Sequence, residues 1–202
     1  MNNETNLNKF LHLSLCPKCQ HELVKIQTGF ACKFCQENFK YNQKEVILFE
    51  PRIEAEKNKD LYEDRNYVEK YAGVFAYGYK VLQFGQMESL HRTVSEMVLS
   101  SACYQLPAYI LDVGCGVGRA TFNCANNLPN TFVVGIDYSE QKLNMAKSIV
   151  TSHEMVSLDL TSWGFGKHSI RGFGLNNVFL YKEMLPPYHL KIQFLILLLM
   201  LI

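Results

Sequence analysis

The stretch Ile110-Leu111-Asp112-Val113-Gly114-Cys115-Gly116-Val117-Gly118 decides the fold of this chain. The apolar run from Tyr109 to Val113 is typical of a short buried strand, and three alternate glycines then lead into a segment, 119–127, that can be helical. A strand that opens through glycines into a helix is how α/β proteins cradle an adenosine-containing ligand. Glycine lets the backbone approach the ligand closely, and the helix N-terminus offers unpaired N–H groups.

A second apolar run, 131–136, ends in Asp137, which lies nineteen residues after Gly118. An acid at the tip of this second strand can accept hydrogen bonds from both hydroxyls of a ribose. Pro129-Asn130 separates the first helix from the second strand, and Ser139 is a good N-cap for a second helix. The order predicts an α/β fold, a doubly wound parallel sheet of the Rossmann type with right-handed crossovers.

Leu111-Asp-Val-Gly-Cys-Gly-Val-Gly118 with Val134-Gly-Ile-Asp-Tyr-Ser139 resembles the first two motifs of class I S-adenosylmethionine-dependent methyltransferases. Gly-x-Gly-x-Gly differs from the Gly-x-Gly-x-x-Gly of pyrophosphate binders, and S-adenosylmethionine has no pyrophosphate. The resemblance implies S-adenosylmethionine as cofactor and a donor site in which Gly114, Gly116 and Gly118 line the methionine and ribose, Asp112 lies near the methionine amino group, and Asp137 binds the ribose. The competing interpretation is a doubly wound domain that binds a nicotinamide cofactor or nothing.

Four of the seven cysteines form two Cys-x2-Cys pairs, which predict a structural zinc site made by Cys16, Cys19, Cys32 and Cys35. Twelve residues separate the pairs, enough for a hairpin from 22–27 and 30–31 with a Thr28-Gly29 turn. His21 is a possible substitute ligand, but four cysteines already complete a tetrahedral site. So small a module needs its metal to fold.

Cys16-Pro-Lys-Cys19, Cys32-Lys-Phe-Cys35 and the run Val46 to Pro51 resemble zinc-ribbon segments fused ahead of some bacterial methyltransferases. Those segments are similar to the small activator subunit of eukaryotic and archaeal methyltransferases. We therefore predict a zinc ribbon over 1–50, a linker and aromatic-rich helical segment over 51–86, and a methyltransferase core over 87–202. The aromatic segment either packs in the core or caps the ligand pocket. A helix over 87–100 is expected to turn Met97 and Val98 inward.

Two stretches compete for the third strand. Residues 155–159 come at a natural distance and end in an acid, whereas 177–181 follow Gly174-Leu175 and precede Leu185-Pro186, as in the family's usual run. We prefer the second, so 151–173 becomes a glycine-rich insertion. The contact with the adenine amine stays open between Asp159 and Glu183, and no residue is identified as a catalytic base.

The apolar run Phe194 to Ile202 is too short for a membrane helix, which needs about twenty residues, and suits a central fourth strand. A class I fold has seven strands, so the resemblance implies a sheet that lacks its C-terminal strands, as in a truncated product or a chain that a partner chain completes.

Charge and composition bound the remaining functions. The 202 residues carry a net charge of +1 and are 48% hydrophobic, which predicts a packed core and indicates no nucleic-acid footprint, although RNA binding is not excluded. The polar N-terminus lacks the apolar core of a signal peptide, so a cytoplasmic protein without a membrane segment is expected. We expect a methyltransferase with an unidentified acceptor, a small molecule or RNA. The alternative is a non-catalytic zinc-ribbon interaction module with a remnant methyltransferase domain.

Overall fold

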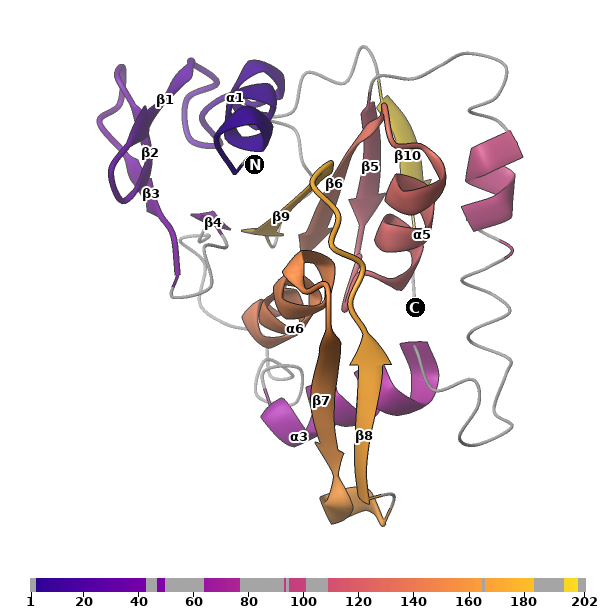
Figure 1. Ribbon diagram of the computed structural model, residues 1–202. Coiled ribbons are helices and arrows are strands. Elements are labelled where there is room, and N and C mark those ends of the chain that lie inside the picture. The colour runs from indigo at the N-terminus through magenta and orange to yellow at the C-terminus, as the bar shows by residue number, and fades with distance from the viewer. Residues whose placement is uncertain are drawn as a thin grey trace.

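The centre of the described part of the protein is a parallel sheet of five strands. The computed structural model describes residues 3–42, 47–49, 64–76, 93, 95–100, 109–164, 166–183 and 195–199. The strands lie in the order β10-β5-β6-β9-β4, with every neighbouring pair parallel (Figure 1). Their bounds are β4 Ile47–Phe49, β5 Tyr109–Val113, β6 Phe132–Asp137, β9 Val178–Glu183 and β10 Leu195–Leu199. The predicted Rossmann-like α/β fold is confirmed.

The helices α5 (Arg119–Asn127) and α6 (Glu140–Thr151) follow β5 and β6, as the sequence predicts. The hydroxyl oxygen of Ser139 accepts a hydrogen bond from the Lys142 N–H at 3.2 Å, which confirms the N-cap of α6. Leu143, Ala146 and Val150 of this helix are buried. The capped α6 therefore begins two residues after the acid that ends β6.

The third strand of the sheet is the one preferred from sequence. Val134 pairs with Phe179, and Asp137 pairs with Lys182, along the β6–β9 ladder. The competing stretch at 155–159 is not in this sheet. It belongs to β7 (Met155–Leu160), which pairs antiparallel with β8 (Gly166–Arg171) through the 3-10 turn η2 (Thr161–Trp163). The expected insertion is thus a hairpin that extends away from the sheet (Figure 1).

The run near the C-terminus forms β10, parallel to β5, with Leu195 opposite Tyr109. The expected strand is confirmed, but its expected central position is not, because β10 lies at one edge of the described sheet. Leu185 and Pro186 lie outside the described residues.

The N-terminal segment begins with a helix that sequence analysis did not assign, α1 (Asn3–Leu13). Three antiparallel strands follow, β1 (Leu23–Ile26), β2 (Gly29–Cys32) and β3 (Asn38–Lys40). Gly29 pairs with Ile26, so the hairpin turn is at Gln27 and Thr28, one residue earlier than expected. β4, which lies within the expected ribbon of 1–50, pairs with β9 in the parallel sheet.

Helix α3 (Arg65–Lys70) and the π-helical turn η1 (Tyr71–Ala76) precede the sheet. Residues 95–100 are also helical, with Val98 buried as expected and Met97 65% exposed, against expectation. Adjacent helical residues lie about 100° apart around the axis, so Met97 can point to solvent while Val98 faces the core. The expected linker at 51–63 lies outside the described residues.

Side chains alternate between the two faces of the sheet, as period-two strands require. Ile110, Val133, Val178 and Leu180 pack with α5 and α6. The opposite face packs with α1 and the cysteine-bearing segment through Tyr109, Leu111, Val113, Phe132, Val134, Ile136, Phe179 and Tyr181. The sheet is therefore sandwiched between a helical layer and an N-terminal layer.

Candidate functional site

The glycine turn lies at the carboxyl end of β5. Gly114, Gly116 and Gly118 have φ values of 78°, 56° and 83°, in the left-handed region that favours glycine. A Cβ on Gly118 would lie 2.2 Å from the Phe122 ring, so a side chain there would also clash with α5. At Gly116 such a Cβ would be in ordinary van der Waals contact, with its nearest atom, Cε1 of Tyr71, 3.6 Å away.

Asp137 ties the end of β6 to this turn. Its Oδ2 accepts a hydrogen bond from the Gly116 N–H at 2.8 Å, and its Oδ1 accepts one from the Ser139 N–H, also at 2.8 Å. The side chain is only 7% exposed. A carboxylate offers about four lone-pair sites to hydrogen-bond donors. The spacing of nineteen residues therefore brings the acid and the glycines to one place.

Asp112 lies beneath the turn and is completely buried. Its Oδ2 accepts a hydrogen bond from the Thr121 hydroxyl, whereas its Oδ1 has no hydrogen-bond partner in the described part of the chain. Burial, with a smaller contribution from the charge of Asp137, raises the pKa of Asp112 to about 7, although the bond from Thr121 opposes the shift. A cation near Oδ1 would satisfy this oxygen and favour the charged carboxylate.

Tyr71 of η1 belongs to the aromatic-rich segment that was expected either to pack in the core or to cap the ligand pocket. A Cβ on Gly116 would lie 3.6 Å from Cε1 of Tyr71 and 3.9 Å from its hydroxyl oxygen, so the ring covers the turn. The Lys142 Nζ lies 4.7 Å from the ring centroid. Burial, and next the charge of Asp137, raise the pKa of Tyr71 to about 12, so its hydroxyl stays protonated. The available signal was the four-residue spacing of Tyr67 and Tyr71.

Cys115, inside the turn, is not a candidate nucleophile. It is buried, and burial followed by the charges of Asp112 and Asp137 raises its pKa well above the ordinary thiol value. Because the thiolate is the reactive form, this cysteine is an inert packing residue.

The two candidates for an adenine contact lie in different places. Asp159 is exposed on the hairpin, where its Oδ1 accepts the Thr161 N–H at 3.0 Å. A hydrogen bond with the Thr161 side chain, and next the one from the Thr161 N–H, lower the pKa of Asp159. Glu183 ends β9, one residue beyond the Lys182 that pairs with Asp137. By its position in the backbone, only Glu183 stands at the edge of the sheet that carries the glycine turn.

A cavity of about 490 Å³ lies away from this edge, beside the amino end of β9. Its lining includes Val178 of β9, Lys147 and Thr151 from the last turns of α6, and His153. Parallel strands place their carboxyl ends at the opposite edge, so the cavity is separate from the glycine turn.

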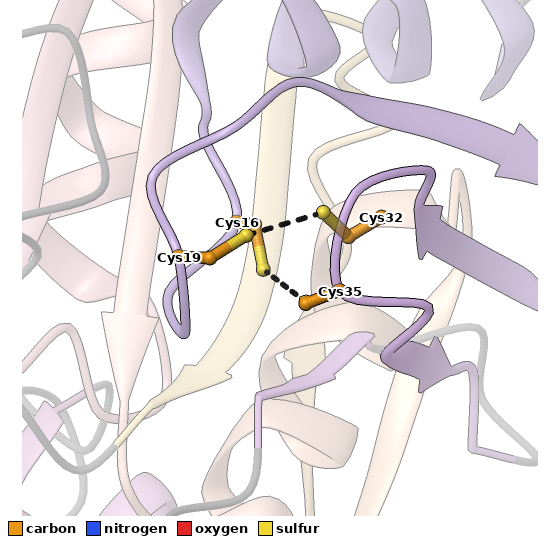
Figure 2. A group of neighbouring side chains, drawn as sticks. All are labelled: Cys16, Cys19, Cys32 and Cys35. Atoms are coloured by element: carbon orange, nitrogen blue, oxygen red, sulfur yellow. Dashed lines mark hydrogen bonds between the residues drawn. The ribbon is translucent and has the colours of Figure 1, made fainter.

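The second candidate site brings together the four cysteines that the sequence predicts. Cys16 and Cys19 come from the loop before β1, and Cys32 and Cys35 from the end of β2 and the loop after it, and all four point toward one another (Figure 2). The Sγ atoms lie within 4.8 Å of one another, with 3.5 Å between Cys16 and Cys35 and 3.4 Å between Cys19 and Cys32. A tetrahedral site with Zn–S bonds of about 2.3 Å needs S–S separations of about 3.8 Å. The donor set and its geometry fit zinc.

Both cysteine pairs have the same backbone turn. Gln20 N–H donates to the Cys16 carbonyl, and Gln36 N–H donates to the Cys32 carbonyl. Gln20 and Gln36 have φ values of 61° and 59°, a conformation uncommon for residues other than glycine. His21 points elsewhere: its ring stacks on Phe34 at 3.7 Å, and its Nδ1 lies 2.8 Å from the Cys19 carbonyl oxygen. The four thiols thus form the candidate metal site without this histidine.

No helix in the described part of the chain combines the length and the apolar character needed to cross a membrane.

Comparisons with known proteins bear on the glycine turn. A family model described as "Methyltransferase domain" matches residues 107–163. Malonyl-[acyl-carrier protein] O-methyltransferase of Halalkalibacterium halodurans is 30% identical over 97 residues, which are 48% of this chain and 36% of that protein. Trans-aconitate 2-methyltransferase of an Acidovorax species is 28% identical over 80 residues, 40% of this chain and 31% of that protein. The chain thus spans about a third of each relative's length.

Among solved structures, magnesium protoporphyrin IX methyltransferase from Synechocystis with bound SAH is similar over 62% of this chain and 49% of that one. The identity is 20% and the TM-score 0.40, too low a likeness to bear on function. The match to the family model includes the glycine turn and Asp137. Over residues 107–163, the chain is similar to methyltransferase domains.

Proposed function

We propose that this chain binds S-adenosylmethionine at the glycine turn and transfers its methyl group to a small-molecule acceptor. The observation that carries the proposal is the buried Asp137 carboxylate beside the glycine turn, whose Oδ2 accepts the Gly116 N–H at 2.8 Å. The two ribose hydroxyls of an adenosyl group are donors of the kind that a carboxylate accepts. Glu183, at the same edge of the sheet, is our candidate for the adenine contact.

Asp112 supports a cationic ligand in particular. Its buried Oδ1 has no partner among the described residues, and its pKa of about 7 makes its charge sensitive to a nearby cation. S-adenosylmethionine carries an ammonium and a sulfonium, whereas a nicotinamide dinucleotide presents a pyrophosphate. We assign Asp112 to the methionine amino group, as the family resemblance implies.

In the proposed reaction an acceptor nucleophile attacks the sulfonium methyl in line, and the thioether leaves as a neutral group. Because the donor is already activated by its positive charge, the protein contributes mainly by orienting it and by excluding water. Tyr71 over the glycine turn, with the buried Asp112 and Asp137 below, supplies both effects. A small-molecule acceptor is supported by the names of the two relatives, which act on malonyl-[acyl-carrier protein] and trans-aconitate.

Zinc at the four cysteines is part of the proposal. Burial raises the pKa of the Cys16 thiol to about 12, so binding of the metal there displaces a proton and depends on pH. The ion would have a structural role, since four sulfur ligands complete its coordination. We propose the division into a ribbon over 1–50, a connecting segment over 51–86 and a core over 87–202, with β4 as the ribbon's contribution to the core sheet.

Isothermal titration with S-adenosylmethionine and S-adenosylhomocysteine tests the donor site. The parent chain should bind both, and Asp137→Ala should weaken binding at least about tenfold, since a charge-assisted hydrogen bond contributes about 1.5–3 kcal/mol. The matched control is Asp159→Ala, which alters an exposed carboxylate and should leave the affinity unchanged. A folded parent that binds neither compound, with Asp137→Ala indistinguishable from it, would refute the proposal. Methyl transfer to trans-aconitate, a malonyl thioester and RNA, assayed in parallel, identifies the acceptor class.

A further inference from the structure

The N-terminal layer is part of the hydrophobic core beneath the donor site. One continuous cluster of buried side chains includes Cys16 and Cys32 of the metal site, Phe10 of α1, and Leu111 and Ile136 of the central strands. Leu111 immediately precedes Asp112, and Ile136 immediately precedes Asp137. Two of the candidate zinc-ligating cysteines and the two strands that end at the glycine turn therefore belong to one hydrophobic core.

Phe10 of α1 contacts both the parallel sheet and the cysteine-bearing segment. Its ring is fully buried, and its centroid lies 4.3 Å from that of Phe179 and 5.0 Å from that of Tyr181, both on β9. On its other side the ring stacks on Phe30 of β2 at 5.6 Å. Phe30 is followed two residues later by Cys32, so the aromatic stack leads from the parallel sheet to a metal-ligating strand.

Polar contacts attach the layer on either side of this stack. The Asn6 Nδ2 donates to the carbonyls of Asn176 and Val178, at 2.6 and 3.3 Å, where the chain enters β9. The Asn42 Nδ2 donates to Glu140 Oε1 at 2.8 Å and to Asn144 Oδ1 at 2.9 Å, in the first turns of α6. Glu140 lies three residues after Asp137, so the second attachment is next to the donor site.

The backbone itself joins the two parts. β4 follows the cysteine-bearing strands in the sequence and forms an edge strand of the described parallel sheet. Ile47 lies opposite Tyr181, and Phe49 lies opposite Glu183. A ribbon that lost its structure would therefore release the packing on one face of the sheet and leave β4 without its anchor. The segment from Cys16 to Tyr41 is too small to fold stably without a cross-link. Among the described residues, a metal ion bound by the four thiols can supply that cross-link.

We propose that the four-cysteine ribbon is a structural layer of the donor-binding sheet, so that zinc loading is required for the packing of β5 and β6 and, through it, for donor binding. The clause on donor binding rests on the proposed function, whereas the clause on packing does not.

Hydrogen exchange of the full-length chain tests the packing directly. Zinc is removed with a chelator and restored with zinc chloride, and exchange is followed in peptides that cover 109–113 and 132–137. The amides of both strands should exchange at least about tenfold faster without zinc and recover when it is restored. Unchanged protection of these strands, with faster exchange confined to 23–32, would overturn the proposal.

A pair of substitutions separates the layer from the metal itself. Phe10→Leu should retain one zinc per chain, measured by colorimetric release, yet show faster exchange in β5 and β6. Phe34→Leu makes the same change on the ribbon at a side chain that is 68% exposed, and should match the parent in both measurements. Exchange in Phe10→Leu equal to that in Phe34→Leu would contradict the role of the layer.

Titration with S-adenosylhomocysteine completes the test. Affinity should fall about tenfold or more in the metal-free chain and in Phe10→Leu, within the usual range of coupling between sites. If the zinc-loaded parent does not bind this compound at all, the proposed function fails, and the exchange data still decide whether the ribbon supports the sheet. Equal affinity with and without zinc would overturn the coupling.

Discussion

At the scale of single residues, the buried carboxylate of Asp112 makes a prediction about pH. Its pKa is about 7 in the folded chain against 3.8 for a free side chain, so the folded state binds the proton more tightly. The stability that this proton contributes is fully present below about pH 4 and is lost as the pH rises through about 7. Without donor, the parent should lose about 2.6 kcal/mol more than Asp112→Asn between pH 5 and pH 8.

Urea unfolding at the two pH values measures this difference. Other titrating groups are common to both proteins and cancel in the comparison. Identical losses in the parent and in Asp112→Asn would show that Asp112 does not titrate in this range.

Tyr71 makes a second prediction at this scale. Because its ring covers Gly116 and lies beside Asp137, Tyr71→Ala should uncover the turn and weaken binding of S-adenosylhomocysteine about tenfold. Tyr67→Ala, a half-buried tyrosine one turn earlier, is the matched control and should bind within about twofold of the parent. Equal affinity of the two variants, measured by calorimetry, would remove Tyr71 from the site.

At the scale of secondary-structure elements, the β7–β8 hairpin supports the glycine turn from outside the sheet. Leu158 and Leu160 of β7 are buried in a cluster with Val68 and Ala72 near Tyr71 and with Val117 of the turn. Leu158→Ala should therefore destabilise the chain by about 2–5 kcal/mol and weaken donor binding. Met155→Ala, on the same strand but 58% exposed, should change stability by about 0.5 kcal/mol or less. Denaturant midpoints of the two variants test the contrast.

The sequence predicts elements well where a local pattern determines them. The β5–α5–β6–α6 order, the Ser139 cap and the preferred third strand are confirmed, because glycines, caps and apolar runs act over a few residues. The hairpin at 155–171 and helix α1 were not predicted, because their apolar side chains are buried by residues that are distant in the sequence. Phe10, for example, is buried by Phe179, which is far away in the chain.

The residues of the candidate site also differ in how well the sequence predicts them. The four cysteines and the pair of Asp137 with the glycines are marked by spacing, and the structure brings each set together. Tyr71 comes from a helix upstream of the sheet, so its position depends on how α3 packs against β7, which no local pattern reports. Met97 was wrongly expected to face the core, because its local apolar pattern does not reveal that its side chain is exposed to solvent.

At the scale of the whole molecule, the shared core predicts cooperative unfolding. Because side chains of the ribbon and the sheet belong to one buried cluster, the metal-loaded chain should unfold in a single transition. With cobalt(II) in place of zinc, the thiolate-to-metal absorption reports on the ribbon, and far-ultraviolet circular dichroism reports mainly on the sheet and helices. The two midpoints should coincide within error. Loss of the absorption several degrees before the dichroism would show that the ribbon is an independent unit.

The pairing of β4 with β9 also fixes an order of events during synthesis. Val178 lies 129 residues after Phe49, so at ordinary ribosome rates the ribbon waits about 6–26 s for its partner strand. In that interval the nascent chain already contains all four thiols and can acquire its metal, with the aromatic side of α1 still uncovered. The later strands then assemble against a finished surface. A cell short of zinc would make the same strands with no such surface to receive them.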